Sequence, residues 1–246
     1  MQVITAGKAF PAISSSVTLF RNPGFGTLLF DTGSPYEQES LRLALSVGGL
    51  EPAEVDLVVL SNWHIDHIGG MGLFPRARFV ASRHTVSLNL ALGAALDGVE
   101  GEALPIAVLA QRLGIVVEQS QPTDRAMIAR YRGLANICWR NRAVIRHFAQ
   151  CVAQGRVIGP DDLALGGMGG LVWHELAGHT DGDLLLSLAD QAGTHWLCAG
   201  DAVLSAGADL DPTAASLIRS LVERIAPAEL RVVPGHGPFF RWEGQS

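Results

Sequence analysis

The first third of the chain alternates short apolar runs with turn-forming residues. Residues 17–20 and 26–30 are rich in Val, Leu, Phe and Thr, which is the composition of β-strands. Between them, Arg21-Asn22-Pro23-Gly24 is typical of a turn. The pattern therefore predicts a β-hairpin over residues 17–30.

Two other spacings of apolar residues predict a helix and then strands. Residues 36–48 carry apolar side chains at helical spacing on a polar background, which predicts a helix. These side chains are Leu41, Leu43, Ala44, Leu45 and Val47. Residues 55–60 form a nearly continuous apolar run, as expected for a strand buried on both faces. Residues 78–81 are a further short strand candidate.

The middle of the chain has a different composition. Residues 84–156 are dominated by Ala, Leu, Arg and Gln, which predicts a helical insertion with helices at about 84–96 and 124–154. Strand patterns return after it, at 162–176, 183–190, 195–200 and 230–233, with a helix at 213–226. This order indicates an α/β fold in which two β-sheets stack face to face with helices outside.

Length and composition fit one globular domain. The chain has 246 residues, of which 48% are hydrophobic and 17% are charged, so it can bury a substantial core. We therefore treat residues 1–246 as a single domain. The formal net charge of −6 argues against a nucleic-acid partner, because proteins that bind nucleic acid are normally basic.

The cysteines and the lengths of the apolar runs indicate the cellular compartment of the protein. Cys138, Cys151 and Cys198 form no CxxC pair, which is typical of reduced thiols in a cytosolic protein. The N-terminus lacks a charged start followed by an apolar signal core, and no apolar run reaches membrane-spanning length. We expect a cytoplasmic protein with no membrane partner. The sequence leaves the oligomeric state open, a homo-oligomer included.

The densest group of metal-binding side chains lies in Asn62-Trp63-His64-Ile65-Asp66-His67. This segment directly follows the apolar run that ends at Leu60, and a rigid strand end is a suitable mount for a site. Imidazole nitrogen and carboxylate oxygen both suit a divalent ion such as zinc or iron. The spacing therefore predicts a metal centre at the end of this strand.

With these residues the chain resembles the metallo-β-lactamase superfamily, whose signature at this point is His-x-His-x-Asp-His. Four more segments resemble landmarks of that family, in the family's order: Phe30-Asp31-Thr32-Gly33, Gly178-His179-Thr180, Ala199-Gly200-Asp201 and Pro234-Gly235-His236-Gly237. The resemblance implies an αββα sandwich with metals at one edge between the sheets. An Asp at the position of Asp201 resembles the glyoxalase II and lactonase branches.

The resemblance also implies a role for each matching residue. His64 and His179 would belong to a first metal site and Asp66, His67 and His236 to a second, with Asp201 between the two. Asp31 would support the metal loop without direct ligation. In the family's usual reaction a metal-activated water attacks an electrophilic carbon or phosphorus, and Asp66 orients that water or moves its proton.

Asn62 departs from the family pattern, because it stands where the family has its first His. A neutral carboxamide is a weaker ligand than imidazole for a metal such as zinc. We therefore predict unequal sites, with one tight Zn²⁺ at the second site and a weak or absent ion at the first; Fe or Mn are alternative ions. Asn62 could be a weak ligand, hydrogen-bond a metal-bound water, or only hold the loop.

Arginines are concentrated in the insertion, and Asp124 is the only acid between positions 121 and 156. One interpretation is a solvated helix face. The other is a lid over the metal cleft that attracts an anionic substrate or an acidic carrier protein. The first candidates for substrate binding are Arg130, Arg132, Arg140 and Arg142.

These features lead to three hypotheses about function. The first is a metal-dependent hydrolase of a small-molecule ester, thioester or lactone. The second is a mononuclear-iron oxidoreductase of the persulfide-dioxygenase type, since Asn62 weakens one site. The third is a member that has lost the usual ligand set, and that binds without turnover or performs non-hydrolytic chemistry in a biosynthetic pathway.

Overall fold

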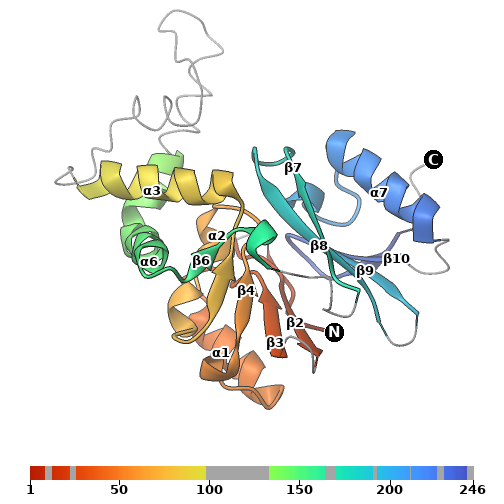
Figure 1. Ribbon diagram of the computed structural model, residues 1–246, viewed down its shortest axis with the longest axis horizontal. Helices are drawn as coiled ribbons and strands as arrows, with labels where there is room; N and C mark the ends of the chain where they lie inside the picture. Colours follow the sequence, from red (N-terminus) through yellow and green to blue (C-terminus); the bar gives the residue numbers. More distant parts are fainter. Residues whose placement is uncertain are drawn as a thin grey trace, which may run out of the picture.

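The protein is an αββα sandwich, as the sequence predicts (Figure 1). The computed structural model describes residues 1–8, 13–22, 26–97, 133–163, 170–190, 193–210, 212–225 and 230–242. Two β-sheets face each other. The helices α1 (Gln38–Val47), α3 (Arg83–Asp97) and α6 (Arg142–Ala153) lie outside the first sheet, and α7 (Pro212–Ile225) lies outside the second.

Six strands form the first sheet within the described residues, in the order β1-β2-β3-β4-β5-β6. They are β1 (Gln2–Thr5), β2 (Val17–Asn22), β3 (Gly26–Phe30), β4 (Leu57–Val59), β5 (Arg78–Val80) and β6 (Val157–Ile158). β1, β2 and β3 pair antiparallel, which confirms the predicted hairpin, and β3 to β6 pair in parallel. The carboxyl ends of β3 and β4 therefore meet at one edge.

Five strands form the second sheet among the described residues, in the order β11-β10-β9-β8-β7. They are β7 (Val172–Leu176), β8 (Asp183–Ala189), β9 (His195–Gly200), β10 (Leu230–Pro234) and β11 (Phe240–Arg241). β8 is antiparallel to both β7 and β9, and β9 is parallel to β10. The carboxyl ends of β7, β9 and β10 therefore lie at the same edge of this sheet.

Alternation along the strands divides the apolar side chains among three layers. In β4, Leu57 and Val59 face the second sheet, whereas Val58 packs toward the helices of the first layer. All three side chains are buried, which confirms the prediction of a strand covered on both faces. On the outer face of the second sheet, Leu185 and Leu197 pack against Ile218 of α7 (Pro212–Ile225).

The predicted helix at 36–48 is α1 (Gln38–Val47). Leu41 and Leu45 are buried and face the core, but Leu43 and Val47 are 66% and 82% exposed. Only one face of the helix contacts the core, so two of its apolar side chains remain exposed to solvent.

The predicted insertion is helical where the structure describes it. α3 (Arg83–Asp97) and α6 (Arg142–Ala153) pack on each other, and residues 133–140 are also helical. The continuous helix predicted at 124–154 is wrong within the described part, because Asn141 interrupts it with φ −104° and ψ 22° while its Nδ2 donates to Ile137 O at 2.9 Å. Residues 98–132 lie outside the described residues.

The strand predicted at 162–176 begins only at Val172. Residues Pro160–Asp162 form a 3-10 turn instead, because Pro160 favours a helical start and the Gly159 amide donates to Asp162 Oδ2 at 2.9 Å. The short edge strands β1, β6 and β11 were not predicted. No helix in the described part of the chain is both long enough and apolar enough to cross a bilayer.

Candidate metal centre

The predicted ligand residues converge where the two sheets present the carboxyl ends of their strands. Asp31 follows β3, and His64, Asp66 and His67 follow β4 in the first sheet. In the second sheet His179 follows β7, Asp201 follows β9 and His236 follows β10. The centre is thus built from both halves of the chain, across the gap between the sheets.

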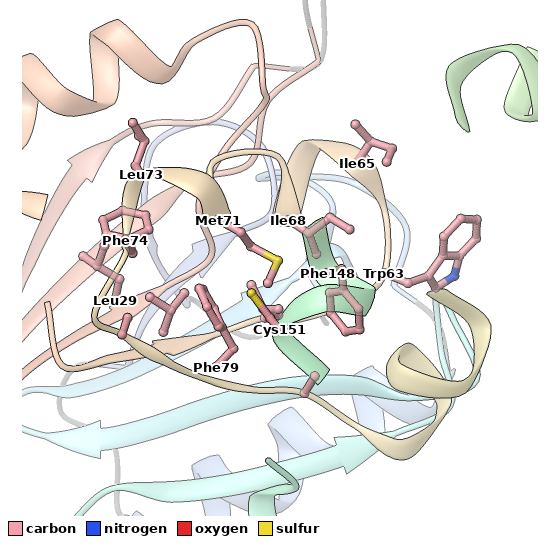
Figure 2. Close-up of a cluster of buried hydrophobic side chains, with 14 of the residues drawn as sticks. Leu29, Trp63, Ile65, Ile68, Met71, Leu73, Phe74, Phe79, Phe148 and Cys151 are labelled. Carbon is pink, nitrogen blue, oxygen red and sulfur yellow. The ribbon is translucent and has the colours of Figure 1, made fainter. Parts of the chain in front are cut away.

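The loop after β4 is held by its apolar side chains. Ile65–Ile68 form the short helix α2, in which Ile65 and Ile68 are buried in the cluster that contains Met71, Phe148 and Cys151 (Figure 2). Trp63 is also buried, and its ring centroid lies 4.4 Å from that of His64. Because Ile65 and Ile68 point into the core, the neighbouring His64, Asp66 and His67 face the other ligand candidates.

His67 is fixed by a buried hydrogen-bond network. Its Nδ1 lies 2.8 Å from Asp31 Oδ2, and a carboxylate can only accept, so Nδ1 donates. Asp31 also accepts hydrogen bonds from the backbone amide and the hydroxyl of Ser61, each at 2.8 Å. This orientation turns His67 Nε2 toward Asp201 Oδ2, at 3.2 Å.

Asp31 adopts a backbone conformation that is uncommon for its residue type. Its φ is 62°, and it is the one non-glycine residue with positive φ among those described. Its carboxylate supports both Ser61 and His67, as noted above, so the conformation serves the metal loop. Strained backbone of this kind is concentrated at functional sites.

His236 is fixed in the same manner from the other side. Its Nδ1 donates to the Ser14 carbonyl at 2.9 Å, and its backbone amide donates to Leu204 O at 2.8 Å. Its Nε2 then lies 3.2 Å from Asp201 Oδ1 and 3.6 Å from Asp66 Oδ2. Both ring nitrogens that face the centre in this half are therefore Nε2 atoms.

His179 lies in the β7–β8 loop, which Asp183 stabilises. Asp183 accepts hydrogen bonds from the Thr180 hydroxyl at 2.6 Å and from the Thr180 amide. His179 Nε2 lies 3.2 Å from His64 Nδ1 and 3.3 Å from Asp201 Oδ2. The side chains of His64 and His179 are 25% and 30% exposed, so this half of the centre opens to solvent.

Two glycines allow the strand ends to approach closely. A Cβ at Gly235 would overlap Asp201 Oδ1, and a Cβ at Gly200, whose φ is 52°, would lie 2.7 Å from the Ser61 side chain. Side chains at these positions would displace the carboxylate or the loop. The Gly-Asp and Gly-His pairs are therefore part of the geometry of the centre.

The potential ligand atoms form two groups. The ligand atoms of His64, His179 and Asp201 lie within 4.8 Å of one another, and so do those of Asp66, His67 and His236. Within the described structure, the buried atoms His67 Nε2 and Asp201 Oδ1 have no hydrogen-bond partner. Buried polar atoms are rarely left unpaired, and nitrogen with carboxylate oxygen suits a divalent ion. These residues therefore fit a metal.

The charges of the ligand residues also affect one another's pKa values. Burial disfavours charge on Asp201, but the facing imidazoles of His67, His236 and His64, with His67 foremost, hold the pKa of Asp201 well below its usual range. Burial also disfavours the charged form of His67, but Asp201, Asp31 and Asp66 raise its pKa well above 6.5. Without a metal, a proton on His67 thus balances the carboxylates.

Four arginines were predicted as substrate-binding candidates, and Arg130 and Arg132 lie outside the described residues. Arg140 Nε donates to Asn136 Oδ1 at 3.1 Å, and Arg142 donates to Trp139 O at 3.0 Å while stacking on the Trp139 ring. Both arginines therefore engage their own helical neighbours.

Several supporting residues were not predicted, namely Ser14, Ser61, Thr32 and Asp183. Thr32 Oγ1 donates to His67 O at 2.7 Å and accepts from the Gly70 amide. Asp183 lies three residues after Thr180, a spacing typical of local side-chain to backbone hydrogen bonds. The role of Asp183 could therefore have been predicted from this spacing. The role of Ser14 could not, because it acts through its backbone carbonyl, which no sequence pattern marks.

Comparisons with curated proteins cover a limited part of the chain. The rat Metallo-beta-lactamase domain-containing protein 1 is 46% identical over 57 residues, which are 23% of this chain and 23% of that protein. The human protein of the same name is 47% identical over 57 residues, 23% of this chain and 21% of that protein. The chain thus matches under a quarter of the length of these relatives.

Solved structures match over most of the chain. A Thermotoga maritima protein assigned as a metallo-beta-lactamase has a TM-score of 0.58 at 17% identity, covering 98% of this chain and 97% of that one. The hydrolase AbOPH of the beta-lactamase superfamily has a TM-score of 0.59 at 21% identity, covering 91% and 72%. These similarities show a shared fold.

The family itself is shown by the sequence. The model of the Metallo-beta-lactamase superfamily matches residues 11–236, which include every residue of the two ligand groups. The matched span begins before β2 and ends on the last histidine ligand candidate. Together with the two-sheet fold, this match shows that the chain belongs to the metallo-β-lactamase superfamily.

Proposed function

We propose that this protein is a metal-dependent hydrolase that cleaves an ester, thioester or lactone bond in a small molecule, with zinc as its native metal. The observation that carries the proposal is the pair of adjacent ligand groups, in which Asp201 of the first group also lies 3.2 Å from His67 Nε2 and from His236 Nε2 of the second. Among the described residues, the buried atoms His67 Nε2 and Asp201 Oδ1 have no hydrogen-bond partner. When bound, a divalent metal supplies Lewis acidity: it makes a water molecule more acidic and polarises the bond to be cleaved.

The chain's own residues divide the remaining work. Asp31 and the Ser14 carbonyl fix the rings of His67 and His236, so that little reorganisation accompanies the reaction. Asp66 is partly exposed, and its Oδ2 lies 3.6 Å from both His67 Nε2 and His236 Nε2. As a ligand candidate, Asp66 would bind the metal through one carboxylate oxygen, and its other oxygen would hold a water and take up its proton.

The exposure of the centre and the charge of the protein favour a small-molecule substrate. His64 and His179 provide the exposed rim, whereas His67 and His236 are buried. The net charge of −6 argues against nucleic acid as the substrate. An acyl carbonyl group would approach from the side of His64 and His179, which are the more exposed residues of the centre.

The test is a screen of purified, zinc-loaded protein against ester, thioester and lactone panels, with Asp66→Asn and His67→Ala as site variants. His195→Ala is the matched control, since it removes a histidine that belongs to neither ligand group. We expect turnover that both site variants reduce by at least about 100-fold and the control preserves. Turnover that is indifferent to Asp66 and His67 would contradict the proposal.

A mononuclear-iron oxidoreductase is the second candidate function. Two histidines and one carboxylate whose ligand atoms lie close together, as in Asp66, His67 and His236, are also the ligand type of non-haem iron oxygenases. Metal analysis after anaerobic purification separates the candidates. Stoichiometric iron with oxygen uptake supports the oxidoreductase, and zinc with hydrolytic turnover supports the hydrolase.

A further inference from the structure

Asn62 is fully buried, and its carboxamide is turned toward the backbone. Its Oδ1 accepts a hydrogen bond from the His64 amide at 2.8 Å. The oxygen assignment is physically required, because a backbone amide can only donate. The one atom of this side chain that could bind a cation therefore holds the turn leading to His64.

The other end of the carboxamide is unsuited to a metal. Asn62 Nδ2 is buried and has no acceptor in the described part of the structure. An amide NH₂ group only donates and carries partial positive charge, so it cannot replace an imidazole nitrogen as a ligand. The His64 and His179 group consequently lacks a third nitrogen ligand.

The two groups also differ in how firmly their histidines are oriented. In one group, the Nδ1 atoms of His67 and His236 are held by Asp31 and by Ser14 O. For His64 and His179, no described residue holds the ring nitrogen that points away from the centre. Hydrogen bonds of this kind typically change metal affinity by about 10–100-fold.

Ligand number and burial add to the difference. Asp66, His67 and His236 form one group, and Asp201, which is grouped with His64 and His179, also lies 3.2 Å from His67 Nε2 and from His236 Nε2. Asp201 is therefore shared by both positions and gives the second one four potential ligands, of which His67 and His236 are buried. His64 and His179 have only the shared Asp201, and both are partly exposed. Four protein ligands can fill a tetrahedral zinc site, whereas three leave one position to water or substrate.

We propose that this protein holds one resident metal, bound by Asp66, His67, His236 and Asp201, and that Asn62 leaves the His64 and His179 position to a weakly bound, exchangeable ion or to the substrate. The inference rests on the proposed metal-dependent function, but it concerns binding, which is measured without turnover. Asn62 acts here as a positioning residue for His64 and not as a ligand.

The experiment measures zinc directly. Metal-free protein is titrated with Zn²⁺ against a chromophoric chelator, and retained metal is counted by elemental analysis after gel filtration. We expect about one retained equivalent and a second ion bound at least about 100-fold more weakly. His236→Ala should lose the retained ion, whereas His179→Ala should keep it. His195→Ala is the control for the loss of a histidine outside both groups.

Asn62→His tests the cause. It should raise the retained zinc from about one to about two equivalents and bring the two dissociation constants closer together. If Asn62→His does not fold, the wild-type count and the His179→Ala and His236→Ala variants still decide. Two equally tight ions in the wild type, or loss of the retained ion in His179→Ala, would overturn the inference.

The outcome is separable from that of the proposed function. One retained ion without turnover on any ester, thioester or lactone supports this inference and contradicts the proposed substrate class. Two tight ions with turnover contradict this inference and support the hydrolase. Each combination therefore identifies which of the two proposals has failed.

Discussion

His67 Nε2 and Asp201 Oδ2 lie 3.2 Å apart although they belong to different sheets and are 134 positions apart in the chain. His67 follows β4 in the first sheet, and Asp201 follows β9 in the second. In the metal-free protein this pair joins the two halves across the gap. A metal bound between the two residues would strengthen the same connection, so metal binding and stability should be coupled.

The pH dependence of the metal-free protein follows from this pair. The pKa of His67 is raised well above 6.5, so its contribution to stability is fully present below pH 6.5 and is lost as the pH rises through the raised value. The pKa of Asp201 is lowered, so its contribution is present above pH 3.8 and is lost only as the pH falls through the lowered value. The metal-free protein should therefore unfold at a higher temperature near about pH 6 than near about pH 9.

Zinc should reverse this trend, because it must displace the proton from His67. Thermal unfolding across this pH range, with and without zinc, provides the measurement. The metal-free His67→Gln variant serves as the control and should lose most of the pH dependence. A metal-free wild type that is more stable at the alkaline end would contradict the assignment of a protonated His67.

Asp31→Asn should weaken metal binding while leaving the backbone in place. Asn tolerates positive φ, so the conformation at 62° is preserved. The variant loses the carboxylate that orients His67 and accepts from Ser61, and zinc affinity should fall by about 10–100-fold. Asp56→Asn is the matched control, because Asp56 accepts from the Thr27 amide away from the centre. Equal zinc affinity of the two variants would contradict the role of Asp31.

Gly235→Ala should displace the Asp201 carboxylate. The added methyl group would overlap Asp201 Oδ1, and the adjoining backbone of Gly200 leaves no space for a shift. We expect weaker zinc binding and a loss of about 1–3 kcal/mol in the free energy of unfolding. Gly72→Ala is the control, since nothing lies within 4 Å of a Cβ at that position. Normal zinc binding by Gly235→Ala would argue against this packing.

The thiols should be unreactive in the folded protein. Burial raises the pKa of Cys138 and of Cys198 to about 12, and Cys151 is also buried with a raised pKa. Since the thiolate is the reactive form, an aromatic disulfide reagent at about pH 8 should label none of them rapidly. After unfolding, all three cysteines should react. Rapid labelling of native protein would show that the core opens easily.

The fold could be predicted because its strands carry strong local patterns. Residues 55–60 are apolar except for Asp56, and a short run of this kind is typical of a strand covered on both faces. The weaker predictions lie at edges. β6 is only two residues long and pairs with β5 beyond the insertion, so no local periodicity marks it. The break at Asn141 depends on one side-chain hydrogen bond to Ile137 O, which composition does not encode.

The candidate site could be predicted as a set of residues but not as an arrangement. The motif around His64 and His67, and the later His179, Asp201 and His236, are visible in the sequence. The sequence does not show that one group is buried and the other partly exposed. It also does not show which ring nitrogens are held by hydrogen bonds, since Ser14 holds His236 through its backbone carbonyl. A carbonyl is common to all residues, so the sequence contains no sign of this contact.

The sequence by itself determined the order of the elements, the family and the identity of the ligand residues, because these depend on local apolar spacing and on rare residue types in short motifs. Only the tertiary structure decided what Asn62 does. The sequence left ligand, hydrogen-bond donor and loop support open for this residue. Packing the loop against the core turned its oxygen to the His64 amide. The contact itself joins residues only two positions apart. The tertiary structure decided that Asn62 is fully buried, and burial fixes the carboxamide in this one orientation, which the local sequence does not specify.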